Sequence, residues 1–330
     1  MKKIFFWVML MTAALAVTAE ENLYRMAPAD TAGTLRLQTG ALLAQPLLKD
    51  LAARSGEVDK AVQQMEKLST EQSGLKDAGI KQVLYTFSDQ QRWCVFMECT
   101  GVTESLFRST LLREYPNAQE ITIAGRTAYV LKQQDVSLGG RKLRGMDDLA
   151  VAVMLFRENL IVAGAVSELA GILNGPTLDP VKADQLNRIE GLIVLDVLDC
   201  SPLNRLFVQE PGTQLFRSVR GIGTIEGSQA KMQAELQCSG EAEAQEVAGQ
   251  LQQTAMFAIP MSLSADPELA QQIMKRLKIS ADKDKVCAEV VFTREMLTAA
   301  AEYKNKSREL RQKRREMRKR ARAAEKTTAL

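Results

Sequence analysis

Every second residue is apolar in two runs of the chain, Trp93–Cys99 and Met232–Cys238. Alternate residues of a strand point to the same side, so each run predicts a strand that packs one side against a core. A second predicted strand comes just before each run, and a polar residue with a glycine follows it (Thr100-Gly101 and Ser239-Gly240). A helix is predicted after each glycine.

The two runs belong to longer segments that match each other, Lys81–Leu112 and Arg220–Leu251. When Cys99 is aligned with Cys238, apolar positions fall on apolar positions throughout the second strand. Each segment reads as strand, turn, strand and helix, so we interpret the pair as an internal duplication. A chance match between two hairpin–helix units, which are common, is the alternative.

Further periodic runs extend both segments to the order β-α-β-β-α-(insert)-β-α. The first insert holds two predicted hairpins, which turn at Ala124-Gly125 and at Arg157-Glu158-Asn159. The last helix begins after Thr293 and can continue to about Ala324, because its residues favour helix. We therefore expect an α+β fold of two tandem ferredoxin-like (split β-α-β) repeats. Their antiparallel sheets would carry helices on one face, and a long basic helix would end the chain.

The first residues have the pattern of a secretory signal peptide. Lys2-Lys3 precede the apolar run Ile4–Leu15, and Val17-Thr18-Ala19 form a small-residue cleavage site. We expect cleavage near Ala19 and a soluble mature chain that is periplasmic or secreted. The predicted parts of the chain are the signal peptide (1–19), a first repeat (20–175), a linker (176–188), a second repeat (189–302) and a basic helical tail (303–330).

The chain has no histidine, which excludes the usual general base, the usual zinc ligand and Ser-His or Cys-His nucleophiles. Its cysteines are Cys94, Cys99, Cys200, Cys238 and Cys287. In a split β-α-β unit the last strand lies beside the first, which would bring Cys287 close to Cys200. We expect this pair to form the disulfide, if any forms in an oxidising compartment. Buried free thiols are the alternative.

No catalytic, cofactor or metal site is predicted from motifs, because phosphate-binding loops and nucleophile elbows are missing from the sequence. Asp196 and Asp199 stand at the end of a predicted strand, where two carboxyl groups could act as acid and base. We favour a helix cap at Asp199 or Ser201 and a solvated Asp196 instead. The aromatic side chains of the first hairpin are expected to pack in the core.

The strongest charge feature is the C-terminal segment from Tyr303 to Leu330, where twelve Lys and Arg face three Glu, a net charge of +9. Residues 20–302 carry a net charge near −8, because the chain after Ala19 has 41 basic and 40 acidic residues. The candidate polyanion-binding residues are Arg311, Lys313, Arg314, Arg315, Arg318, Lys319, Arg320 and Arg322. A solubilising extension is the alternative.

These features predict an exported, non-catalytic binding protein of unknown ligand. Its cationic C-terminal helix would contact a polyanion, which could be anionic lipid, surface polysaccharide or nucleic acid. Two other functions stay open. One is a hydrolase that uses carboxylates or a Ser-Lys pair. The other is a structural assembly subunit of the cell envelope, which would present an exposed sheet edge or an exposed apolar face.

Overall fold

The computed structural model describes residues 22–54, 58–59, 62–63, 79–88, 93–131, 137–138, 141–142, 151–201 and 215–303. The strands up to residue 165 are β1 (Gly33–Leu37), β2 (Ile80–Phe87), β3 (Trp93–Cys99), β4 (Gln119–Ile123), β5 (Arg126–Leu131), β6 (Ser137–Leu138), β7 (Arg141–Lys142), β8 (Val151–Arg157) and β9 (Leu160–Ala165). The later strands are β10 (Ile193–Val197), β11 (Phe216–Glu226), β12 (Gln229–Cys238), β13 (Lys278–Asp282) and β14 (Lys285–Phe292). The helices are η1 (Leu23–Met26), α2 (Thr39–Leu43), α3 (Pro46–Arg54), α5 (Glu104–Glu114), α6 (Val166–Asn174), α7 (Pro180–Asn187), α9 (Glu241–Ser262) and α10 (Pro267–Arg276).

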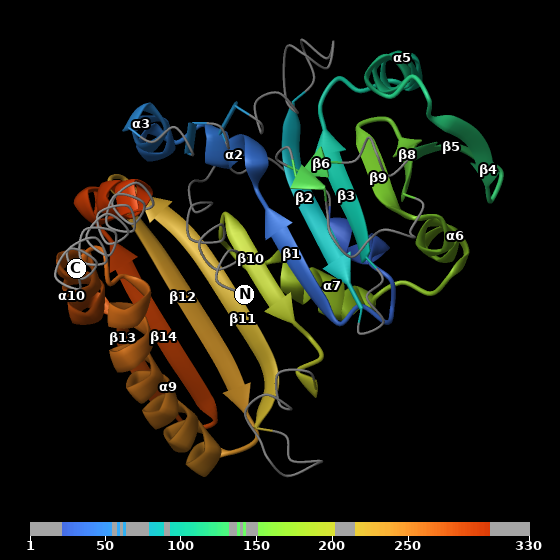
Figure 1. The fold of residues 1–330 in the computed structure, drawn as a ribbon. Helices are drawn as coiled ribbons and strands as arrows, with labels where there is room; N and C mark the ends of the chain where they lie inside the picture. The colour runs from blue at the N-terminus through green and yellow to red at the C-terminus, as the bar shows by residue number, and fades with distance from the viewer. Residues whose placement is uncertain are drawn as a thin grey trace, which may run out of the picture.

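One antiparallel sheet of twelve strands runs through the molecule, in the order β13-β14-β12-β11-β10-β1-β2-β3-β9-β8-β5-β4 (Figure 1). Its centre is the pairing of β1 with β10, where Leu35 lies opposite Leu195. The first half continues outward through β2, β3, β9 and β8, and the second through β11, β12, β14 and β13. The two halves therefore follow the same order from the centre, and the hairpin β4–β5 extends the first half.

The mixed α+β fold with antiparallel pairing is as the sequence predicts, but the split β-α-β strand order is not found among the described strands. That order would place β14 beside β10. Instead β14 pairs with β12 and β13, while β1 pairs with β2. The alternation of side chains determines which face of a strand is apolar, and it leaves open which strand becomes the neighbour. The prediction of the strand order was therefore wrong.

Both matched segments form the predicted pair of strands followed by a helix, as β2-β3-α5 and β11-β12-α9, and residues 89–92, between β2 and β3, lie outside the described part. Cys99 ends β3 and Cys238 ends β12, and both side chains are buried. The hairpin turn at Ala124-Gly125 is also present between β4 and β5. Both of its residues have positive φ, 48° and 77°, as a two-residue hairpin turn that matches the strand twist requires.

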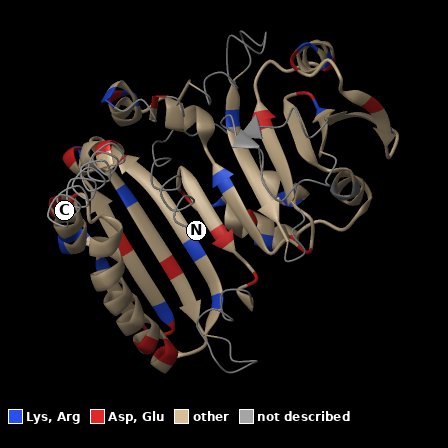
Figure 2. Cartoon of the chain, in the orientation of Figure 1, with Lys and Arg blue, Asp and Glu red and all other residues tan. Residues whose placement is uncertain are grey.

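The helices are distributed differently in the two halves, whereas the sequence predicted helices on one face only. In the second half, α9 and α10 lie on one face, where Val247 and Ala248 of α9 pack near Val286 of β14. The other face of β12 carries the polar residues Lys231, Gln233 and Glu235. Basic and acidic residues both occur on the strands of this half (Figure 2). The ammonium of Lys231 lies 2.8 Å from the carboxylate of Glu289 of β14.

In the first half both faces of the sheet are apolar and carry helices. Phe107 and Leu111 of α5 pack with Tyr129 of β5 on one face. On the other face Phe96 of β3 packs in a cluster with residues of η1, α6 and α7. The face that is polar in the second half is therefore a second core layer in the first.

The segment 176–188, which we interpreted as a linker, contains the helix α7. Asp179 caps α7 by accepting hydrogen bonds from the backbone N–H groups of Val181 and Lys182, both at 3.0 Å. Ala183 and Leu186 of α7 are buried in the core of the first half. The segment thus joins the two halves while packing as part of the first.

Candidate functional site

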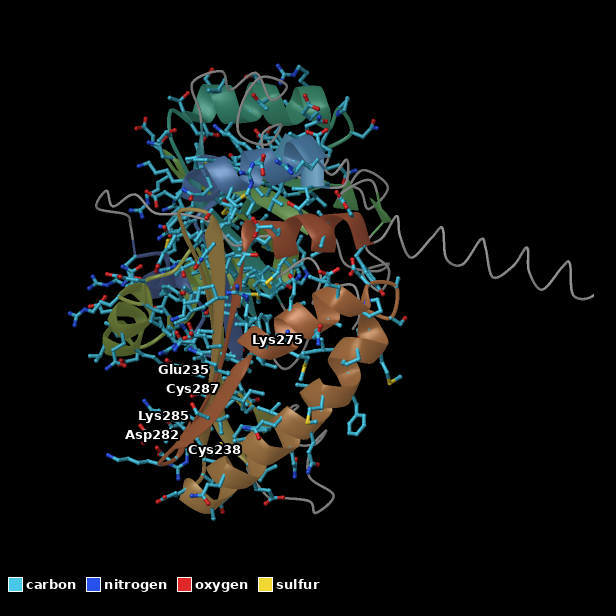
Figure 3. All side chains as sticks on the ribbon, turned by 90° about the vertical axis from the view of Figure 1, so that its left-hand side faces the viewer. Glu235, Cys238, Lys275, Asp282, Lys285 and Cys287 are labelled. Carbon is cyan, nitrogen blue, oxygen red and sulfur yellow. The ribbon has the colours of Figure 1, made fainter. Side chains whose placement is uncertain are left out.

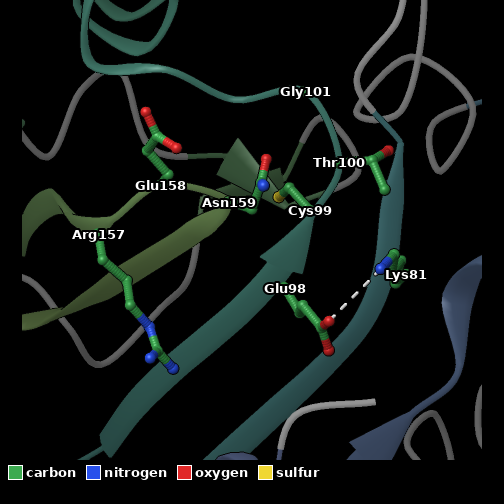
Figure 4. Close-up of a pocket in the computed structure, with 8 residues that line it drawn as sticks. All are labelled: Lys81, Glu98, Cys99, Thr100, Gly101, Arg157, Glu158 and Asn159. Atoms are coloured by element: carbon green, nitrogen blue, oxygen red, sulfur yellow. Dashed lines mark ion pairs between the residues drawn. The ribbon is translucent and has the colours of Figure 1, made fainter. Parts of the chain in front are cut away.

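A shallow cavity of about 330 Å³ opens at one end of the first half (Figure 4). It lies where β2 begins, β3 ends and the β8–β9 turn passes close by. Its lining residues are Lys81, Glu98, Cys99, Thr100, Gly101, Arg157, Glu158 and Asn159. Two basic and two acidic side chains thus share one small cavity.

Asn159 fixes the backbone around this cavity. Its φ is 64°, a left-handed conformation that asparagine adopts more readily than most residues. Its side-chain Oδ1 accepts a hydrogen bond from the N–H of Val102 at 2.8 Å, and its carbonyl accepts one from the N–H of Cys99 at 2.7 Å. These bonds tie the β8–β9 turn to the end of β3.

Glu98 is the most buried charged group of the cavity, with 8% of the residue exposed. Its Oε2 accepts a hydrogen bond from the buried amide of Gln82 at 2.7 Å, and the ammonium of Lys81 lies 3.7 Å from its Oε1. Sequence reasoning missed this group. Glu98 is a charged residue at an inward-facing position of an otherwise apolar strand, and this pattern could have identified it.

Cys99 lies in the cavity wall, and its thiol is poorly suited to nucleophilic attack. Burial, and secondarily the charge of Glu98, raise its pKa to about 11. The thiolate, which is the nucleophile, is therefore scarce at neutral pH. Cys99 is therefore not an activated nucleophile in this arrangement.

The two aspartates considered as an acid–base pair have different surroundings. Oδ1 of Asp199 accepts hydrogen bonds from the N–H of Ser201 at 2.9 Å and from its hydroxyl at 2.6 Å, whereas the helix predicted to follow lies outside the described residues. Asp196 is only 3% exposed, and its Oδ1 accepts a 2.7 Å hydrogen bond from Arg220 of β11. Our prediction of a solvated Asp196 was wrong, because η1 and α7 cover this part of β10.

Asp196 belongs to a buried polar cluster at the centre of the sheet, where the two halves meet. The cluster also contains Tyr24 of η1 with Thr34 and Arg36 of β1, all 3% exposed or less. Arg36 donates hydrogen bonds to the carbonyls of Asn187 and Ile189 at the end of α7. Burial raises the pKa of Tyr24 to about 12.

The remaining polar atoms of this cluster are incompletely paired. Oδ2 of Asp196 has no hydrogen-bond partner among the described residues, and the hydroxyls of Tyr24 and Thr34 have at most a weak hydrogen bond to each other. Leaving such atoms unpaired in a low dielectric is costly, so the cluster contributes less stability than its number of polar groups suggests.

The aromatic residues of the first hairpin divide between the two faces of the sheet. Phe96 is fully buried, as predicted. Tyr85, Phe87 and Trp93 are half-buried on the opposite face, where the rings of Tyr85 and Trp93 stack with centroids 6.3 Å apart. These three rings lie outside the cavity lining.

The expected Cys200–Cys287 disulfide is contradicted by the strand order. Two strands, β11 and β12, separate β10 from β14. The neighbour of Cys287 in its strand, Val286, is in the same core cluster as Cys200. Cys287 therefore points to the opposite face, where it lies opposite Glu235 (Figure 3). Both cysteines are free thiols.

The candidate polyanion-binding residues all lie outside the described part of the chain. They are Arg311, Lys313, Arg314, Arg315, Arg318, Lys319, Arg320 and Arg322. Within the described residues, no group of three or more Cys, Asp or Glu is placed to hold a metal ion. None of the described helices is long and apolar enough to cross a membrane.

Comparison with known proteins identifies similar solved structures only. No family model and no curated protein matches the chain. Crystal form III of TP0453 matches 86% of this chain and 98% of its own, with 12% identity and a TM-score of 0.49. Crystal form I of the same protein matches 86% and 98%, with 10% identity and a TM-score of 0.45. These similarities carry no functional information for this chain.

Proposed function

We propose that this chain is an exported, non-catalytic binding protein whose basic C-terminal segment contacts a polyanion. One observation carries the proposal: the segment from Tyr303 on has a net charge of +9, whereas residues 20–302 carry about −8. Such charge segregation attracts a polyanion to one part of the molecule and repels it from the rest. The signal-peptide pattern supports export.

The proposal that the protein is non-catalytic is supported by the surroundings of its candidate reactive groups. The carboxylate of Asp196 accepts a hydrogen bond from Arg220, and that of Asp199 accepts one from the hydroxyl of Ser201. The raised pKa of Cys99 keeps its thiol protonated at neutral pH. The cavity beside Lys81 and Glu98 suits a small polar ligand that has both an acidic and a basic group.

The test compares the full-length protein with a version that ends at Tyr303, on heparin, anionic vesicles and DNA. The shortened version keeps the hydrogen bond from the Tyr303 hydroxyl to the carbonyl of Ser262. We expect the full-length protein to bind at low salt and to lose binding at high salt. Equal binding by the two forms would leave the segment as a solubilising extension.

We also propose that the two halves arose from one duplicated unit. The shared strand order from β1 and β10 outward and the equivalent positions of Cys99 and Cys238 support this. Superposition of β1-β2-β3-β9-β8 on β10-β11-β12-β14-β13 tests it. An unrelated path of the backbone through the two sets of strands would overturn the proposal.

An assembly subunit is the second candidate function. Among the described strands, β4 and β13 form the two edges of the sheet, and each pairs on one side only. Open edges can pair with another chain. Light scattering over a range of protein concentrations would show oligomers if this function is correct, and a monomer at all concentrations would exclude assembly of the protein on its own.

A further inference from the structure

The end of α9 presents apolar side chains to solvent. Met256, Phe257 and Met261 are 62%, 72% and 77% exposed, and with Val181 they are the large apolar residues that stand out as exposed in the described part of the chain. Phe257 and Met261 are four residues apart, so they share one side of the helix. We call these three residues the α9 apolar patch.

The patch is held in place by packing on the opposite side of the same helical turns. Ile259 and Leu263 pack against a core cluster that contains residues of α10 and of α2 and α3. These contacts prevent the turn from rotating its exposed residues inward. No charged residue occurs from Val247 to Ala265, so covering the patch would not bury a charge.

The described part of the chain ends at Tyr303, next to the end of α9. The hydroxyl of Tyr303, the last described residue, donates a 2.6 Å hydrogen bond to the carbonyl of Ser262, the last residue of α9. Twelve Lys and Arg follow between Lys304 and Lys326. An apolar surface and a strong positive charge therefore start from the same end of α9.

We infer that the α9 apolar patch docks on the surface of an anionic phospholipid bilayer. The apolar side chains would enter the boundary between headgroups and acyl chains, and the net charge of +9 that the sequence carries after Glu302 would attract the chain to the anionic headgroups. This inference rests on the proposed polyanion function and selects one polyanion. Polysaccharide and nucleic acid offer negative charge without an apolar layer that could accommodate Met256, Phe257 and Met261.

A second copy of the chain fits the patch less well. Three side chains contribute little of the roughly 800 Å² that each partner buries in a stable interface. A symmetric contact at the end of α9 would also bring two segments of +9 close together, and their repulsion would oppose association.

The test measures binding to vesicles of phosphatidylglycerol and phosphatidylcholine by co-sedimentation. The variant Met256→Ser/Phe257→Ser/Met261→Ser should bind about tenfold more weakly or worse, because it loses the apolar contribution. Val181→Ser on α7 is the matched control, since Val181 is 65% exposed and lies on another element. We expect this control to bind vesicles as the wild type does.

Heparin separates this inference from the proposed function. The triple variant should bind heparin as the wild type does, because its basic segment is intact. Equal vesicle binding by the triple variant and the wild type would overturn the inference and leave the polyanion proposal standing. If the full-length protein and the version that ends at Tyr303 bind heparin and vesicles equally, the proposed function itself fails.

A direct readout is the fluorescence of a Phe257→Trp variant. Its emission should shift to shorter wavelengths with anionic vesicles and should be quenched by lipids brominated on the acyl chain. The parent protein, which has only its native tryptophans, is the reference. Vesicle binding without a change in the emission of the introduced tryptophan would show that the α9 apolar patch stays in water, and would overturn the inference.

Discussion

Replacement of Asp196 by asparagine tests how the buried cluster at the centre of the sheet affects stability. The side chain is 4% exposed and has one partner, the guanidinium of Arg220 at 2.7 Å. Burial raises the pKa of its carboxyl, and the charge of Arg220 opposes that rise. Because the net shift is upward, the cost of burying the charge exceeds the attraction between the two groups.

The magnitude follows from the bonds that change. Asparagine keeps an acceptor for Arg220 but loses the charge, which weakens that hydrogen bond by about 1 kcal/mol. The neutral amide also removes the buried charge that Oδ2 shares without a described partner, and the desolvation penalty of such an unsatisfied group is about 1–3 kcal/mol. The guanidinium of Arg220 is 37% exposed and stays hydrated. We therefore expect Asp196→Asn to change the free energy of unfolding at pH 7 by about 0 to +2 kcal/mol.

The pH dependence provides the sharper test. A carboxyl with a raised pKa binds its proton more tightly in the folded chain, so its contribution to stability is largest below the unfolded pKa of about 3.9 and is lost as pH rises through the folded pKa. Asparagine does not titrate, so the stability of the variant relative to the wild type should increase between pH 3.5 and pH 7. Urea unfolding at several pH values measures this difference. A variant that is destabilised by 2 kcal/mol or more at pH 7, with no dependence on pH, would refute the reasoning.

Three further predictions concern single residues. Arg36→Met removes the hydrogen-bond donors to the carbonyls of Asn187 and Ile189. It should lower the free energy of unfolding, measured by urea titration, by about 2–4 kcal/mol. A loss of less than about 0.5 kcal/mol would show that water replaces the guanidinium as donor. The thiol of Cys99 has a pKa of about 11, so little of it is thiolate at pH 8. Its reaction with iodoacetamide, followed by mass spectrometry, should be about 100-fold slower or more in the folded protein than in the urea-unfolded protein. Comparable rates in the two states would contradict its burial. The methyl group added by Gly171→Ala in α6 has no atom within 4 Å, so this variant should be more stable by about 0.5–1 kcal/mol and should have a higher thermal midpoint. The methyl group added by Gly164→Ala meets the carbonyl of Trp93 at 3.0 Å, so this variant should have a lower thermal midpoint. The opposite order of the two midpoints would be inconsistent with the pairing of β9 with β3.

The local elements were predictable from sequence where one face of a strand is apolar. The alternation in Trp93–Cys99 and Met232–Cys238 identifies β3 and β12, and the equivalence of Cys99 with Cys238 follows from it. The hairpin at Ala124-Gly125 was predictable because few residues adopt a positive φ at low cost. In each case the signal lies within about ten residues of the feature.

The strand order was not predictable in this way, because pairing depends on contacts between distant segments. The pairing of β1 with β10 joins positions about 160 residues apart, and no local pattern specifies it. The same limit explains the failure of the Cys200–Cys287 disulfide. The hydrogen bond between Gln82 and Glu98 joins neighbouring strands of one predicted hairpin, and it was missed although a charged residue at an inward position signalled it. Asp196 was interpreted as a solvated residue because the sequence does not show that η1 and α7 cover it.

The central claim is that the basic C-terminal segment is the main polyanion contact. The most direct measurement is the dependence of the affinity for single-stranded DNA on salt, for the full-length protein and for the version that ends at Tyr303. If the segment engages six to eight phosphates, the logarithm of the association constant of the full-length protein should fall with the logarithm of salt concentration with a slope of about −4 to −6. The shortened version should show a slope near zero and much weaker binding. Equal slopes and equal affinities for the two forms would contradict the claim.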